Sequence, residues 1–148
     1  MLISYNWLQT YFKKKLPTPE KVVEALMFSA FETESVEKNP SAGGGDTLIN
    51  VKVLPDRAHY ALCHRGIARE LAAALSLEIT LPSRKEPKAE KLHELSIQIE
   101  NKNDCGRYIA RRVEGVTVGE SPKWFRERLE AIGQRSISNI VDAANFVM

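Results

Sequence analysis

The chain has 148 residues, of which 43% are hydrophobic and 27% charged, and its formal net charge is +2. This balance is typical of a globular protein with one ordinary domain or two small ones. No apolar run approaches the roughly 20 residues of a membrane span, and the N-terminus has neither the basic start nor the cleavage site of a signal peptide. Two cysteines are too few for a disulfide framework, so we expect a cytoplasmic protein. The small net charge is only a weak indication of an acidic partner.

The first 40 residues predict two helices and a strand. Ser4 should cap an amphipathic helix, and Thr18 should cap a second one that opens at Pro19. The residues expected on the buried faces are Trp7, Leu8, Tyr11 and Phe12 in the first helix and Val22, Val23, Leu26 and Met27 in the second. Residues 31–37 alternate in polarity and predict a half-buried strand.

The middle of the chain predicts two strands on either side of a helix. A glycine-rich break at 40–46 precedes a strand at 48–54, which is rich in β-branched residues. Residues 54–75 then read as a helix, 77–82 as a short strand, and the polar segment 83–91 as a linker.

The last third predicts a β-pair and a helix. Residues 95–99 and 107–118 alternate in polarity, with a loop between them. Ser121 should cap a helix that opens at Pro122 and closes at Gly133. Its inner face should consist of Trp124, Phe125, Leu129 and Ile132. A chain that ends on the apolar residues 146–148 is expected to stop inside a domain.

Residues 54–75 concentrate the side chains that could carry chemistry. The possible zinc ligands of the whole chain are His59, Cys63, His64, His93 and Cys105. Their spacing lacks the paired pattern of a structural zinc site, which disfavours a metal. A Cys63–His64 nucleophilic dyad is disfavoured too, because adjacent helical residues point to different faces. In the structural alternative, Cys63 is a small buried apolar group.

A nucleic-acid contact is the other functional alternative for this stretch. Arg65 and Arg69 are four residues apart and share a helix face, with Arg57 eight residues before Arg65. Asp56 and Glu70 dilute the positive field. A second basic group is interleaved with acids and is more typical of a solvated face; it consists of Lys123, Arg126, Arg128 and Arg135.

The residues alone favour an architectural helix over 54–75. Asp56 follows Pro55 and is a good candidate for the N-cap. One stripe of the helix carries Ile67, Leu71, Ala74 and Leu75. Gly66 and several alanines would allow close packing.

Three ordered blocks resemble a known family. They are "MLISYNWLQTYF" with "FETESVE", then "VKVLPDRAHYALCHRGIARELAAAL", and finally "GESPKWFRERLEAIGQRSISNIVDAANFVM". Together they resemble the N-terminal part of the β subunit of bacterial phenylalanyl-tRNA synthetases, over nearly the whole chain. The resemblance implies an α+β fold: a small helix/antiparallel-strand domain at 1–82 and, after the linker, the start of a second α+β domain, the editing domain, at 92–148.

The family enzyme attaches phenylalanine to tRNA(Phe) with ATP and Mg²⁺, as an α2β2 heterotetramer without membrane attachment. Its synthetic site lies on the α subunit, and the β subunit contributes scaffolding, tRNA contacts and hydrolysis of mischarged Tyr-tRNA. The resemblance therefore implies no catalytic residue, metal or bound cofactor on this fragment. Asn145 matches a position that lines the editing pocket, and Arg57, Arg65 and Arg69 are candidates for contact with tRNA or with the other subunit.

The chain departs from the family pattern at several positions. The family usually carries an inserted tRNA-binding barrel, where this chain has only "NPSAGGGDT". Asp56 replaces an Asn, while Ser136 and Ala144 stand where the family prefers Pro and Thr. Two other functions remain open: a stand-alone RNA-binding or protein-interaction module of α+β fold, and a small hydrolase.

Overall fold

The computed structural model describes residues 1–29, 31–39, 45–81 and 96–148. Contacts group the chain into two units, Met1–Pro82 with Val118–Met148, and Ser83–Thr117. The expected linker at 83–91 lies outside the described residues, as does most of the glycine-rich break at 40–46. The domain limits 1–82 and 92–148 therefore stay a prediction.

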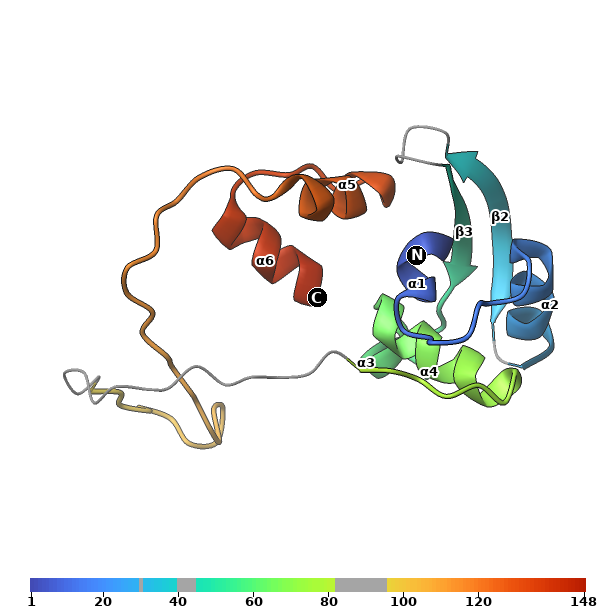
Figure 1. Cartoon of the computed structure of the whole chain (residues 1–148). Helices are drawn as coiled ribbons and strands as arrows, with labels where there is room; N and C mark the ends of the chain where they lie inside the picture. The colour runs from blue at the N-terminus through green and yellow to red at the C-terminus, as the bar shows by residue number, and fades with distance from the viewer. Residues whose placement is uncertain (30, 40–44, 82–95) are drawn as a thin grey trace. The chain divides into compact units, whose positions relative to one another are not determined.

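A three-stranded antiparallel sheet forms the frame of the N-terminal region (Figure 1). Its strands are β1 (Leu2–Ser4), β2 (Glu32–Asn39) and β3 (Asp46–Lys52), in the order β1-β3-β2. The two strands predicted from alternation, at 31–37 and 48–54, are thus confirmed as β2 and β3. The short strand β1 was not predicted, and it pairs with β3 in the register Leu2↔Asn50.

Two helices follow the predicted starts. Helix α1 (Tyr5–Gln9) begins at Ser4, whose side chain accepts a hydrogen bond from the Trp7 N–H, so the predicted cap is confirmed. Helix α2 (Pro19–Ser29) opens at Pro19. Its predicted face is wrong at Met27, which is 59% exposed, because α2 turns only Val22 and Leu26 fully into the core.

The stretch expected to be one helix is divided into two. Helix α3 (Ala58–Ala61) is a single turn, and α4 (His64–Ala74) begins after a break at Leu62 and Cys63. The predicted cap at Asp56 is wrong: α3 starts after Arg57 without a side-chain cap. Cys63 caps α4 instead, and its sulfur accepts from the Gly66 N–H at 3.4 Å.

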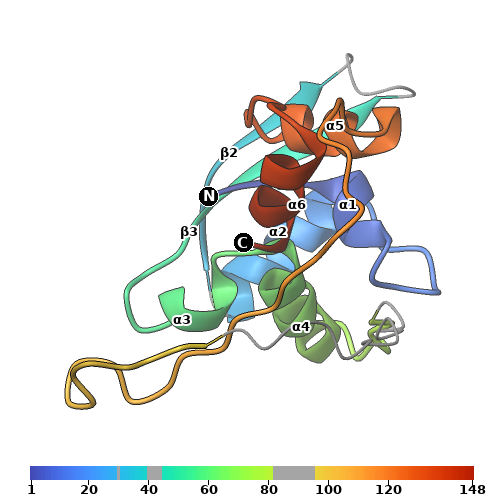
Figure 2. The ribbon, with the colours of Figure 1, turned by 90° about the vertical axis from the view of Figure 1, so that its left-hand side faces the viewer.

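The core lies between the sheet and these helices. In Figure 2, α1, α2 and α4 stand on the same side of the strands. Side chains from every layer are fully or almost fully buried: Ile3, Leu8, Phe12, Leu16, Val22, Leu26, Phe31, Ile49, Val51, Ala61, Ile67, Ala68 and Leu71. The third expected strand, 77–82, is reduced in its described part to one bridge between Phe12 and Ile79.

The described residues 96–117 form no helix or strand. The β-pair predicted at 95–99 and 107–118 is therefore wrong for its described residues, of which only Ile99 is even half-buried. Alternation predicts a strand only when a neighbouring strand accepts its hydrogen bonds, and none of the described segments pairs with this one. The expected loop between the two is present as a turn, closed by the Cys105 N–H on the Asn101 carbonyl.

The C-terminal region contains α5 (Lys123–Ala131) and α6 (Asn139–Val147). Gly133, with φ of +78°, ends α5 as predicted, since a left-handed residue suits glycine. The predicted cap at Ser121 is wrong, because its hydroxyl donates to Asp142 on α6 and not to α5. The predicted inner face holds for Leu129, whereas Trp124 is 55% exposed. The α+β class is confirmed.

Candidate functional site

The exposed face of α4 carries two of the three predicted contact residues. Ile67, Ala68 and Leu71 are buried on the inner side of the helix, and Arg65 and Arg69 are exposed on the outer side. They lie one turn apart, as their spacing predicted. Neither appears in any ion pair that the structure shows between described residues. Their guanidinium groups are accessible to an anionic partner.

Arg57 has a different environment, in which its partly buried side chain is engaged by neighbouring residues. Its Nη1 lies 3.1 Å from the Tyr60 hydroxyl and 3.4 Å from a Glu70 carboxylate oxygen. The guanidinium also stands over the Phe31 ring, 5.6 Å from the centroid. The hydrogen bond to Tyr60, with help from Glu70, raises the pKa of Arg57. The structure thus does not bring Arg57 onto the face of Arg65 and Arg69.

His64 is part of a buried polar network. Its Nε2 accepts a hydrogen bond of 3.0 Å from the Ser4 N–H, and its ring stacks on Trp7 at 3.9 Å. Ser4 also donates its hydroxyl to Asp46, which accepts from the Asn6 N–H at 3.0 Å. Burial lowers the pKa of His64 to about 3. The histidine is therefore a neutral acceptor that joins β1 to α4, a structural role.

The metal and nucleophile alternatives gain no support from the geometry. Within the parts of the chain that the structure describes, no three His, Cys, Asp or Glu side chains lie together in a way that could hold a metal ion. His93 lies outside these parts. Cys63 is engaged as the cap of α4, while His59 is exposed and packs edge-on against Tyr60.

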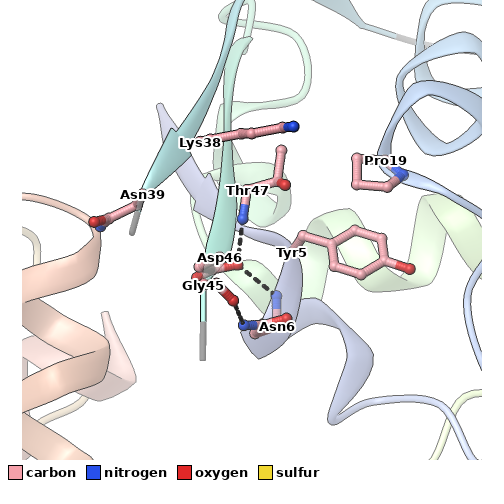
Figure 3. A pocket seen from close by; sticks show the side chains of 8 residues that line it. All are labelled: Tyr5, Asn6, Pro19, Lys38, Asn39, Gly45, Asp46 and Thr47. Carbon is pink, nitrogen blue, oxygen red and sulfur yellow. Dashed lines mark hydrogen bonds between the residues drawn. The ribbon is translucent and has the colours of Figure 1, made fainter. Parts of the chain in front are cut away.

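A pocket of about 550 Å³ opens where α1, the start of α2 and the paired ends of β2 and β3 meet (Figure 3). Its lining residues are Tyr5, Asn6, Pro19, Lys38, Asn39, Gly45, Asp46 and Thr47. Most of its polar groups are already paired. Asp46 accepts from Asn6 and Thr47, the Asn6 amide donates to the Gly45 carbonyl, and the Tyr5 hydroxyl donates to the Pro17 carbonyl.

Asp142 is the polar residue of the C-terminal region that sequence reasoning missed. It is fully buried and accepts from the hydroxyls of Ser121 and Ser136 and from the Ile137 N–H. Those hydrogen bonds, that of Ser121 first, lower its pKa. Ser136 lies six residues before Asp142 and could have indicated part of this hub, whereas Ser121 lies 21 residues before it and gave no local signal. Asn145 lies one turn further along α6 and is half-buried.

No helix among the described residues is long and apolar enough to cross a membrane.

Comparison with known proteins gives the family. Residues 104–148 match the model of the B3/4 domain. The phenylalanine–tRNA ligase β subunit of Rhodopirellula baltica is 33% identical over 150 residues, covering 100% of this chain and 21% of that protein. The β subunit of Anaeromyxobacter dehalogenans is 47% identical over 105 residues (70% of this chain, 13% of that protein), and that of Chromobacterium violaceum is 38% identical over 137 (91% and 17%).

The chain thus spans about a fifth or less of the length of these relatives. The alignment with the Rhodopirellula protein has 150 positions for the 148 residues of this chain. The aligned part of that protein therefore contains no insertion as large as a barrel domain, and neither does this chain. The three sequence blocks, the α+β fold and the B3/4 match agree: this chain is a relative of the phenylalanine–tRNA ligase β subunits, the family that its sequence resembles.

Proposed function

We propose that this chain is the scaffolding and tRNA/editing part of a phenylalanine–tRNA ligase β subunit, which serves the attachment of phenylalanine to tRNA(Phe) with ATP. The observation that carries the proposal is the similarity to a curated β subunit along the entire chain, at 33% identity. The B3/4 match at residues 104–148 supports an editing domain that begins near residue 92.

The proposal assigns the synthetic chemistry to a partner. ATP and Mg²⁺ would act on the α subunit within an α2β2 assembly in the cytoplasm, as the resemblance to the family implies. Phenylalanine-dependent exchange of pyrophosphate into ATP should therefore require both subunits. Exchange by the repurified β subunit alone would contradict this division of labour.

Two groups of residues would serve tRNA. Arg65 and Arg69 are the contact candidates, since both are exposed and outside the ion pairs of the described chain. Arg57 is a weaker one because Tyr60 and Glu70 already engage it. Asn145 would line the editing pocket, where its amide can both donate and accept a hydrogen bond to a substrate hydroxyl or water.

An Asn145→Ala variant of the full-length β subunit, assembled with the α subunit, tests the editing role. Hydrolysis of Tyr-tRNA should slow by about tenfold or more, in line with the loss of a hydrogen bond to reacting substrate, with phenylalanine charging intact. Gln134→Ala is the control, since Gln134 is exposed in the connection before α6. An unchanged rate of Tyr-tRNA hydrolysis would leave Asn145 with a structural role only.

A stand-alone RNA-binding module is the second candidate, favoured by the exposed arginine pair. It predicts salt-dependent binding of unrelated RNAs with equal affinity. A clear preference for tRNA(Phe) in the assembled enzyme would decide against it.

A further inference from the structure

The connection between α1 and α2 carries three consecutive lysines. Lys13, Lys14 and Lys15 are all exposed, and none of them lies in a helix or strand. Adjacent like charges repel one another, so a structure that holds three of them in one place needs compensating contacts.

The Gln9 side chain supplies those contacts. Its Nε2 donates to the carbonyls of Phe12 at 3.2 Å and Lys14 at 3.0 Å. Its Oε1 accepts from the Leu16 N–H at 2.7 Å. One amide therefore bonds the backbone before, within and after the run of lysines, and closes it into a turn.

Both ends of this lysine turn, residues 13–15, are anchored in the core. Phe12 and Leu16 are 6% and 3% exposed. The Tyr11 carbonyl accepts from the Thr80 N–H at 2.7 Å, and Phe12 bridges to Ile79. The three ammonium groups thus project from a backbone that is fixed in advance, which lowers the entropic cost of binding a partner.

The positive charge of the lysine turn is extended by α4. Arg65 directly follows His64, which begins α4 and stacks on Trp7 of α1, the helix that leads into the turn. None of the ion pairs between described residues involves the three lysines, Arg65 or Arg69. Residues 9–17 contain the three lysines and no acidic residue.

We propose that the lysine turn, with Arg65 and Arg69, is a docking surface for the phosphate backbone of RNA. Lysines on a fixed turn act as point charges that contact phosphates without reading bases, and the arginine pair can bond phosphate oxygens in a bidentate manner. The inference rests on the proposed function, under which the RNA is the body of the tRNA.

The test uses the assembled ligase and tRNA(Phe), with affinity measured over a range of salt concentrations. In the triple variant Lys13→Gln, Lys14→Gln, Lys15→Gln, the slope of log affinity against log salt should fall by about 2, at about 0.7 to 0.9 per lost phosphate contact. Affinity near physiological salt should drop about tenfold or more. The matched control, Lys21→Gln, Lys38→Gln, Lys52→Gln, removes the same charge elsewhere and should keep the wild-type slope.

A second variant distinguishes the effect of the fixed conformation of the lysine turn from the effect of its positive charge. Gln9→Leu keeps all three lysines but removes the hydrogen bonds that close the turn. It should weaken tRNA binding a few fold with the salt slope nearly unchanged, since the number of contacts is kept. Thermal unfolding of each variant establishes that it is folded.

Each outcome decides between the proposals. A wild-type slope in the lysine triple, in an enzyme that still charges tRNA, would overturn the docking surface and leave the proposed function standing. Equal losses in both triples would also overturn it, in favour of an effect of net charge. Loss of subunit assembly with unchanged RNA binding would make the partner a protein. If the wild-type enzyme charges no tRNA, the proposed function fails, and the salt slopes alone decide on an RNA surface.

Discussion

The regions 1–81 and 96–117 both contain segments that alternate in polarity, but only the first region forms a sheet. In the first, β2 and β3 pair along their length, and Ile49 and Val51 are fully buried. In the second, large apolar side chains are exposed; they are Ile97, Tyr108, Ile109, Val113 and Val116. Charged residues surround them, and an Arg112–Glu114 ion pair at 2.7 Å forms within the segment.

The difference lies in what covers each segment. Strand β3 has β1 and β2 on its two edges and helices against one face. Residues 107–117 have neither among the described parts of the chain. Buried apolar area, at about 25 cal/mol per Å², is the main favourable contribution to folding. The stability of this chain should therefore come from the first region and hardly at all from the second.

Truncation of a core residue should show the largest contrast. Leu71 is fully buried among the sheet and helices, and Leu71→Ala should cost about 3 to 4 kcal/mol in the free energy of unfolding. Ile109 is 66% exposed, and Ile109→Ala should change it by less than about 0.5 kcal/mol. Urea denaturation of the two variants measures both. Equal losses would show that residues 96–117 contribute to a core.

Acid should destabilise the region 1–81 because His64 is buried in its neutral form. Its folded pKa of about 3 lies below the usual value of 6.5, so the unfolded chain binds the extra proton as pH falls through this window. The contribution of His64 to the free energy of unfolding is therefore most favourable above pH 6.5 and declines toward pH 3. Between pH 7 and pH 4 the loss is about 3 kcal/mol. His64→Gln should abolish this part of the pH dependence, and His59→Gln, at an exposed site, should keep it. An unaltered pH profile in His64→Gln would rule out a buried neutral histidine.

Adding a methyl group at Gly66 and at Gly106 should have different effects on stability. A Cβ on Gly66 of α4 would overlap the Tyr60 carbonyl of α3, whereas one on Gly106 meets nothing within 4 Å. Gly66→Ala should destabilise by about 2 to 3 kcal/mol, because backbone must move. Gly106→Ala should be nearly neutral. Thermal unfolding of both variants measures the difference. An unchanged stability of Gly66→Ala would show that α4 does not lie against α3 at this glycine.

The smallest and most local effect should be at Asp142. Hydrogen bonds from Ser121 and Ser136 lower its pKa, so its stabilising contribution is present above the usual carboxyl range and is lost as pH falls through the folded pKa. The protection of α6 amides, measured relative to the intrinsic exchange rate at each pH, should fall at low pH, and Asp142→Asn should remove this dependence. Asp104→Asn, in the exposed turn, is the control. A loss of protection that is equal in both variants would make the acid effect general.

Sequence patterns predicted the elements whose signals are local. The cap at Ser4, the start at Pro19 and the end at Gly133 depend on neighbouring residues, whereas β2 and β3 show local alternation and also pair with each other. The exposed pair Arg65 and Arg69 likewise follows from helical spacing. These features need no knowledge of distant contacts.

The features that were missed depend on contacts that periodicity and capping rules do not encode. Strand β1 is three residues long and exists because β3 pairs with it, 48 positions away at Leu2↔Asn50. Cys63, not Asp56, is a cap, and it accepts from the N–H of Gly66, a residue that lies against Tyr60 where a Cβ would not fit. The lysine turn has no periodicity, and only the fold shows that Gln9 closes it.

The paired ends of β2 and β3 also have an evolutionary consequence. Asn39 faces Asp46 in the last register of the ladder, and Asp46 also accepts hydrogen bonds from Ser4 and Asn6. The chain therefore leaves the sheet and returns to it at one place, which is the geometry at which whole domains can be inserted or lost without disturbing the host. A lineage could gain or discard a barrel here in a single genetic event, and the rest of the domain would fold as before.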